Sequence, residues 1–129
     1  MAVCIHTANP DTFHKLRGTK LRNVMENFDI LIGFKRGRGL KAIDKPPIHV
    51  NAVITPDNFD EIPGLIEMLE PYANDLTYLM IDPCTRPDYS KESPFILTEK
   101  PESFSRYREI ARQSPLKVMG FDWMFEKST

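Results

Sequence analysis

Four short apolar runs alternate with amphipathic segments along the chain. The runs cover residues 3–6, 48–54, 76–81 and 117–121, and each has the length of a typical β-strand. The second and third runs are apolar at nearly every position. This pattern is typical of strands that helices cover in a parallel sheet. We therefore predict four strands, of which the last has the weakest signal.

The segments between the runs repeat apolar residues every three or four positions, as amphipathic helices do. The first helix begins at Asn9-Pro10-Asp11, where Asn suits the N-cap and Pro the first helical position. In the third helix, Asp57 is the predicted cap. The helices are expected from 10 to 18, from 21 to 32, from 57 to 71 and from 101 to 114.

This βα-βα-βα-β order predicts an α/β fold with a parallel sheet and right-handed crossovers. A complete eight-stranded barrel needs about 250 residues, or about 31 for each βα unit. The chain has 129 residues, so we expect a half-barrel, which is part of a TIM-like partial barrel. The whole chain, 1–129, is then a single incomplete domain. An open doubly wound sheet is the other solution that this pattern allows.

Composition narrows the class of protein. The chain is 41% hydrophobic and 27% charged, which is too apolar for a disordered chain and too polar for a membrane protein. A net charge of −1 argues against bulk electrostatic binding to nucleic acid or an anionic membrane. The N-terminus lacks a signal-peptide pattern. With two cysteines, we expect a reducing, cytoplasmic location.

Polar side chains gather where the predicted strands end. Cys4, His6 and Thr7 belong to the end of the first strand, Asn51 interrupts the second, and Asp82 follows the third. The carboxyl ends of parallel strands are the usual place for ligands in α/β folds. These residues are therefore candidates for holding an anionic or ribose-bearing ligand.

Each candidate also has a purely structural interpretation. The alternative for the first strand is that it ends in a capped turn, because most βα junctions carry such residues. A buried Asn51 needs hydrogen-bond partners, which a neighbouring strand or water can supply. Arg17 follows a short helix and can pair with a carboxylate or remain solvated. The basic, Gly-rich run 33–41 is interpreted as a flexible, solvated loop.

Two segments resemble the radical S-adenosylmethionine enzymes. Residues 4–18, Cys-Ile-His-Thr-Ala-Asn-Pro-Asp-Thr-Phe-His-Lys-Leu-Arg-Gly, are similar to the fourth-strand segment of that family. Residues 50–62, which begin Val-Asn-Ala-Val-Ile-Thr-Pro-Asp-Asn, are similar to its fifth strand and the following helix start. The segments occur in the family's order and at its separation. The resemblance covers residues 3–81 well and the remainder loosely.

The resemblance implies a (β/α)6 partial barrel in which a [4Fe–4S] cluster reduces S-adenosylmethionine. The resulting 5′-deoxyadenosyl radical abstracts hydrogen from a small-molecule or peptide substrate. The three-cysteine cluster loop of the family is absent from this sequence. We therefore expect the carboxyl half of the barrel, inactive alone, with the cluster ligands outside this chain and possibly on a partner chain. No nucleic acid or membrane partner is expected.

The same resemblance implies roles for individual residues. Cys4, His6, Thr7, Arg17 and Asn51 would contact S-adenosylmethionine, with Cys4 standing where the family has Ser and His6 where Asp is commoner. Substrate contacts would come from Asp82 and Asp122, while Cys84 receives no role. The alternative functions are a non-catalytic α/β interaction module and another α/β nucleotide binder.

Overall fold

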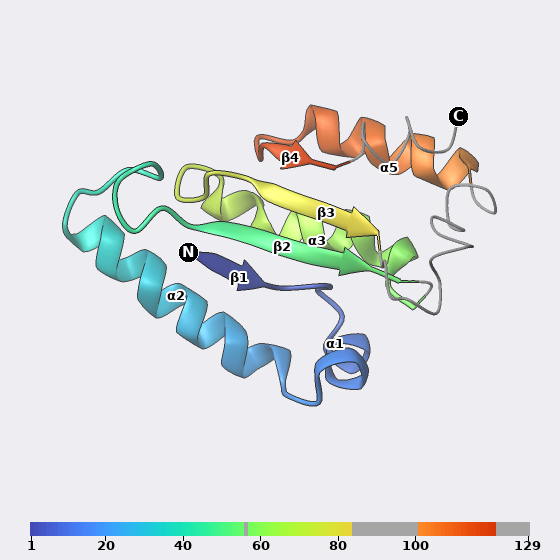
Figure 1. Cartoon of the computed structure of the whole chain (residues 1–129), viewed down its shortest axis with the longest axis horizontal. Coiled ribbons are helices and arrows are strands. Elements are labelled where there is room, and N and C mark those ends of the chain that lie inside the picture. Colours follow the sequence, from blue (N-terminus) through green and yellow to red (C-terminus); the bar gives the residue numbers. More distant parts are fainter. Residues whose placement is uncertain (56, 84–100, 121–129) are drawn as a thin grey trace.

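Four parallel strands form a single sheet in a computed structural model that describes residues 1–55, 57–83 and 101–120. Their spatial order follows the chain, so each strand lies beside its neighbour in sequence (Figure 1). The strands are β1 (Ala2–Cys4), β2 (His49–Ile54), β3 (Leu79–Pro83) and β4 (Val118–Met119). The predicted parallel α/β architecture is confirmed.

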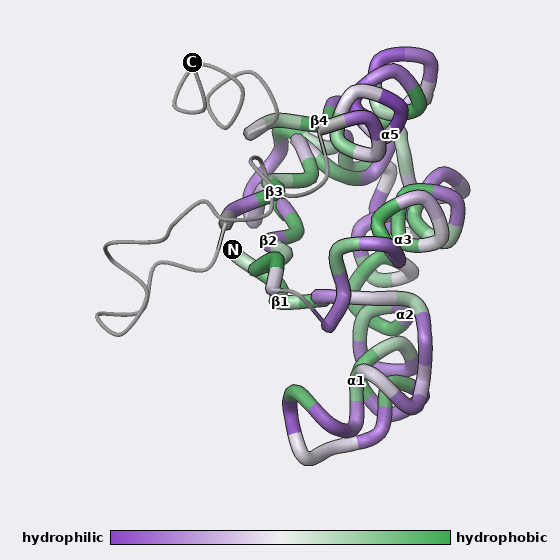
Figure 2. Tube along the Cα trace, turned by 90° about the vertical axis from the view of Figure 1, so that its right-hand side faces the viewer, coloured by the Kyte–Doolittle hydropathy of each residue, from purple (hydrophilic) through white to green (hydrophobic). Residues whose placement is uncertain are grey.

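The described helices all lie on one face of this sheet (Figure 2). A doubly wound sheet carries helices on both faces, so the described part of the chain differs from that architecture. The helices are α1 (Pro10–Arg17), α2 (Leu21–Gly37), α3 (Ile62–Leu69) and α5 (Pro101–Gln113), with short 3₁₀ turns η1 (Phe59–Glu61) and η2 (Glu70–Tyr72).

The two faces of the sheet differ in chemistry because successive side chains of a strand point to opposite sides. Val50, Ala52 and Ile54 are at most 1% exposed, so this set faces the helices. Asn51 and Val53, which alternate with them, are more exposed and therefore point to the other face. We call the face that carries Asn51 and Val53 the uncovered face.

Register places matching residues of neighbouring strands in rows on the uncovered face. Cys4 pairs with Asn51, Asn51 pairs with Met80, and Met80 pairs with Met119. The next row toward the carboxyl ends contains Val53 and Asp82. The hydrophobic core lies on the opposite side of the sheet, between the strands and the helices, and is centred on Ile5, Phe13, Phe28, Leu65, Leu79 and Tyr107.

The start of α1 agrees with the sequence prediction, whereas the start of α3 does not. Asn9 caps α1 as predicted: its Oδ1 accepts from the backbone N–H of Asp11 and Thr12 at 3.0 and 3.2 Å. The predicted cap at Asp57 is wrong. Its carboxylate instead lies 3.2 Å from Lys15 Nζ, and η1 precedes α3.

The basic run 33–41 does not form the predicted solvated loop. Helix α2 continues to Gly37, and the Lys35 side chain is only 2% exposed. Its Nζ donates to the carbonyls of Ala42, Asp44 and Pro46 at 3.3, 2.6 and 2.8 Å. A buried ammonium needs such acceptors, so the following loop is folded around Lys35.

None of the described helices has the length and apolar character needed to cross a membrane.

Candidate ligand site at the strand ends

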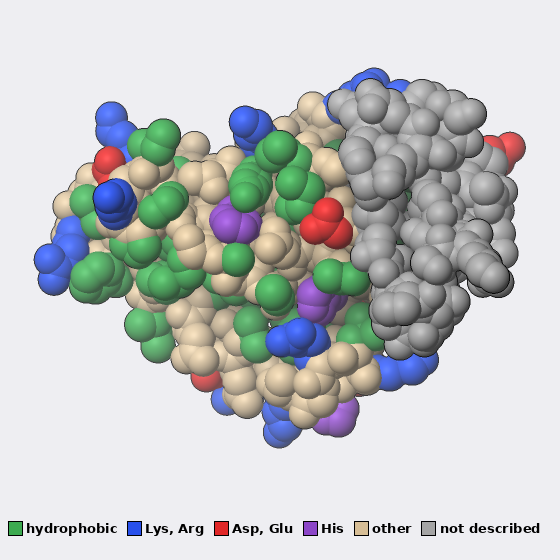
Figure 3. All heavy atoms as spheres, viewed as in Figure 1, with side chains coloured by type: hydrophobic (Ala, Val, Ile, Leu, Met, Phe, Trp, Pro, Cys, Tyr) green, Lys and Arg blue, Asp and Glu red, His purple; other side chains and the backbone are tan. Residues whose placement is uncertain are grey.

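The side chains of the uncovered face are apolar along most of the sheet and become polar toward the carboxyl ends of β1 to β3. Figure 3, viewed as in Figure 1, looks onto this face. Hydrophobic side chains spread over it, with histidine, acidic and basic side chains among them. The polar members that the sequence predicted are Cys4, His6, Asn51 and Asp82.

Asn51 and Asp82 are partly exposed, and their side chains make no hydrogen bond or ion pair within the described residues. Polar groups that are half-buried usually have partners. Two such groups on neighbouring strands of one uncovered face are therefore available to a ligand. The structure brings these two predicted residues to the same face.

His6 follows β1, two residues after Cys4, at the border of the described sheet. It is 8% exposed, and its Nδ1 accepts the backbone N–H of Val53 at 2.9 Å. Burial lowers the pKa of His6 below its usual value of 6.5, and the positive charge of Arg17 lowers this pKa further. The ring is thus neutral at pH 7, and the Arg17 guanidinium lies within electrostatic reach of it.

The pKa of the Asp82 carboxyl group is shifted upward, whereas that of His6 is shifted downward. Burial raises the pKa of Asp82 above its usual value of 3.8, because the charged form loses hydration without gaining a cation beside it. A perturbed carboxyl group in a candidate site is a recognised mark of function, although structural groups also show it.

Thr7 does not join this set. Its side chain is fully buried, and its Oγ1 donates to Glu61 Oε1 at 2.8 Å. Thr12 Oγ1 donates to the other oxygen of Glu61, also at 2.8 Å. Thr7 Oγ1 thus ties the end of β1 to the start of the α3 segment, and the structure does not bring this hydroxyl together with Asn51.

Asn58 is the buried polar residue whose role the sequence did not predict beyond local capping. Its side chain is 0% exposed and makes four hydrogen bonds around the ends of β1 and β2. The Thr55-x-x-Asn58 spacing after a strand was the available signal. It suggested a cap because Asn caps many helices.

The candidate substrate contact Asp122 lies outside the described residues, as does Cys84, to which the sequence assigns no role. Among the residues that are described, no group of three or more His, Cys, Asp or Glu side chains could hold a metal ion. A [4Fe–4S] cluster needs several thiolates together, and the described cysteine, Cys4, cannot bind one alone. We derive no step through such a cluster.

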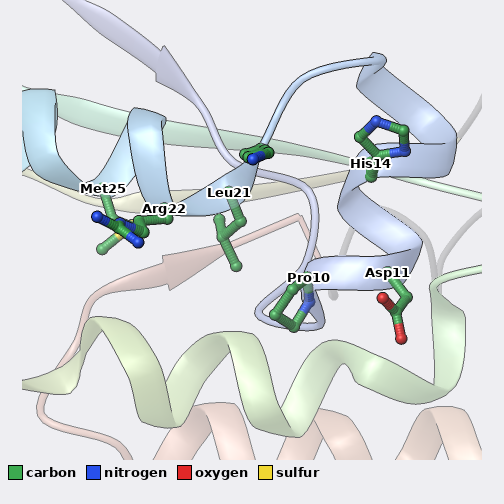
Figure 4. Close-up of a pocket in the computed structure, with 7 residues that line it drawn as sticks. Pro10, Asp11, His14, Leu21, Arg22 and Met25 are labelled. Carbon is green, nitrogen blue, oxygen red and sulfur yellow. The ribbon is translucent and has the colours of Figure 1, made fainter.

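A separate groove lies between α1 and the start of α2 (Figure 4). It has a volume of about 520 Å³, with apolar Leu21 and Met25 and the charged or polar His14, Lys20 and Arg22 among its lining residues. None of the predicted site residues lines it. The groove is therefore distinct from the polar side chains at the strand ends.

Comparison with protein-family models, curated proteins and solved structures finds no match to this chain.

Proposed function

We propose that this chain forms one wall of an S-adenosylmethionine pocket, as the carboxyl half of a radical S-adenosylmethionine barrel. One observation carries the proposal: Asn51, Asp82 and His6 occupy the carboxyl-end region of one uncovered sheet face, with Arg17 in electrostatic reach of His6. The sequence resemblance at residues 4–18 and 50–62 identifies the ligand class.

The chemistry of these groups suits S-adenosylmethionine. Its amino acid part offers a carboxylate and an ammonium group, and its ribose offers hydroxyls. Arg17 can pair with the carboxylate, and Asn51 can both donate and accept. Cys4 lies beside Asn51 in the same row and contributes to the wall of the pocket.

The proposal divides the chemistry between this chain and a partner. The [4Fe–4S] cluster and its ligands would belong to the amino half of the barrel, so the redox chemistry would be supplied outside this chain. The residues described here bind and orient the cosubstrate and exclude water beneath it. Asp82 and Asp122 face the substrate in this scheme, which operates in the cytoplasm or another reducing compartment.

Among the described strands β1 lies at the border of the sheet and pairs on one side, which supports the need for a partner. Ile5 N–H donates to Asn51 O at 3.1 Å, so alternation of the strand directs the N–H groups of Ala2 and Cys4 away from β2. Exposed edges of this kind accept another strand. The fold of a half-barrel, completed by further βα units along β1, accounts for this edge.

A non-catalytic interaction module is the second candidate, and exposed apolar side chains favour it. Ile30 and Phe34, four residues apart on α2, are 70% and 50% exposed, and Ile43 is 78% exposed. Side chains of this size more often face a partner when they cluster. The module would use this surface and leave the uncovered face without a small ligand.

Titration calorimetry with S-adenosylmethionine separates the two candidates. We expect measurable binding by the intact chain and a loss of about tenfold in affinity in Asn51→Ala, which removes one good hydrogen-bonding side chain. Asn27→Ala is the matched control, since Asn27 is exposed on α2. Absence of binding both alone and with a cluster-bearing amino half, or equal affinity in both variants, would contradict the proposal.

A further inference from the structure

Strands β1 and β2 separate where the candidate site begins. Ile5 N–H donates to Asn51 O at 3.1 Å. In a parallel pair, the carbonyl of Ile5 would then accept from Val53, two residues further along β2. Val53 N–H instead donates to His6 Nδ1 at 2.9 Å. The imidazole thus replaces a backbone acceptor at the point where the ladder ends.

The Asn58 side chain bridges the two strands where they separate. Its Nδ2 donates to the carbonyls of His6 and Val53 at 2.9 and 3.0 Å. Its Oδ1 accepts from the N–H and the hydroxyl of Thr55 at 2.7 and 3.2 Å. An amide side chain has two donor hydrogens and two acceptor positions, so Asn58 uses its full capacity on the two strand ends and has none left for a ligand.

The hydrogen bond from Val53 N–H to Nδ1 determines the tautomer of the neutral His6 ring. Because Nδ1 accepts from Val53, the proton of the neutral ring is on Nε2. The Nε2–H makes no hydrogen bond within the described part of the chain. In that part, no buried side-chain nitrogen or oxygen lacks a partner, so this N–H is accessible. The lowered pKa of His6, caused by burial and by Arg17, agrees with a neutral ring.

We infer that Asn58 is a positioning residue that fixes His6 as an Nε2–H donor to an acceptor oxygen of the bound ligand. The ligand part of this inference rests on the proposed function, whereas the state of the ring does not. The charge of Arg17 near His6 favours an anionic oxygen at this position. His6 then cannot accept a proton from the ligand through Nε2.

Nitrogen-15 NMR of the histidine rings tests the inference directly. The chain has three histidines, so the rings of His14 and His49 serve as internal references in the same spectrum. At pH 7.5 we expect His6 to be held in the Nε2–H form and the exposed His14 to average between its two tautomers. A His6 ring with its proton on Nδ1 would overturn the inference without any variant.

Two substitutions then test the role of Asn58. In Asn58→Ser the side chain no longer reaches both carbonyls, so we expect His6 to show mixed tautomers and a pKa nearer 6.5. Affinity for S-adenosylmethionine should fall about tenfold, as for the loss of one hydrogen bond. Thr12→Val, which removes the nearby bond to Glu61, should lower the melting temperature and leave the His6 ring unchanged.

The remaining outcomes are also decisive. A folded Asn58→Ser variant with an unchanged His6 ring would show that Asn58 has only a structural role. If Asn58→Ser does not fold, Asn58→Asp keeps the acceptor Oδ1 and removes both donated bonds, and the tautomer of His6 is read in that variant. If the ring behaves as expected but S-adenosylmethionine does not bind, the proposed function fails and the positioning role stands.

Discussion

Asp82 illustrates how a single residue can lower stability in favour of a site. Its folded-state pKa is raised by burial, so the folded state holds the proton more tightly than the unfolded chain does. Protonation of Asp82 therefore raises the free energy of unfolding as the pH falls through the folded pKa, and this contribution is absent at neutral pH.

Asp82→Asn should accordingly raise the free energy of unfolding at pH 7, because the amide carries no charge to desolvate. The gain over the natural chain should shrink as the pH falls through the folded pKa of Asp82 and disappear below about pH 3, where the carboxyl group is protonated in both states. Urea denaturation at the two pH values measures this difference. Asp11→Asn is the control: it removes a favourable charge from the first turn of α1 and should lower stability slightly at pH 7. A pH-independent gain in Asp82→Asn would contradict this account.

For single residues, the sequence predicted which residue types lie at the strand ends better than it predicted where their side chains point. Alternation in β2 was enough to place Asn51 opposite the apolar set. Thr7 was assigned to the site because β1 was expected to continue through His6, whereas pairing ends after Cys4. Where a strand ends depends on contacts such as Asn58 to His6, and these join residues 52 positions apart. Local pattern does not contain that information.

Among the secondary-structure elements, β4 depends on one glycine. Gly120 has φ +109°, and a Cβ at this position would lie 2.0 Å from the carbonyl oxygen of Ile81 in β3. A side chain there would have to separate the two strands. The weak fourth strand of the sequence is thus held by close contact of backbones rather than by a long apolar run.

Gly120→Ala should cost about 3 kcal/mol of unfolding free energy through this clash and the unfavourable φ. Gly64→Ala in α3 is the matched control, since nothing lies within 4 Å of its added Cβ. In a helix interior, Ala is better than Gly by about 0.5–1 kcal/mol, so this variant should be more stable. Thermal and urea denaturation of both variants check the opposite signs. Equal effects would refute the close contact.

Helix α2 and the loop after it depend on Lys35. Three carbonyls meet its ammonium group, and all would lose their donor in Lys35→Met. We expect a loss of about 2 kcal/mol or more in unfolding free energy, measured by urea denaturation. Lys41→Met, at an exposed position, should change stability by less than about 0.5 kcal/mol. A similar small change in Lys35→Met would show that water replaces the ammonium group at no cost.

The same region shows a limit of pattern reading. The run 33–41, with its glycines and four basic residues, Lys35, Arg36, Arg38 and Lys41, predicts solvent exposure because lysine is rarely buried. Lys35 is the exception because backbone carbonyls of the loop converge on it. By contrast, the alternation of apolar runs and helices correctly predicted the parallel order of the strands, since that order follows from short right-handed connections.

At the scale of the molecule, the central asymmetry is that all of the described helices lie on one face of the sheet (Figure 2). Amide exchange should reveal the unequal borders of this sheet. We expect slow exchange for β2 and β3, which are paired on both sides, and fast exchange for Ala2 and Cys4. Addition of the partner half should protect Ala2 and Cys4. Protection of these two amides in the isolated chain would mean that the edge is already closed, for example by self-association, which light scattering would detect.

Cys4 gives this asymmetry a practical use. Its exposed thiol lies in the same row as Asn51, on the face where a ligand is proposed to bind. In a Cys84→Ser background, a nitroxide or an environment-sensitive dye attached to Cys4 would lie against that surface. Such a label would detect any molecule that binds to the sheet, whatever its identity, and distance measurements from it would locate the partner half proposed above.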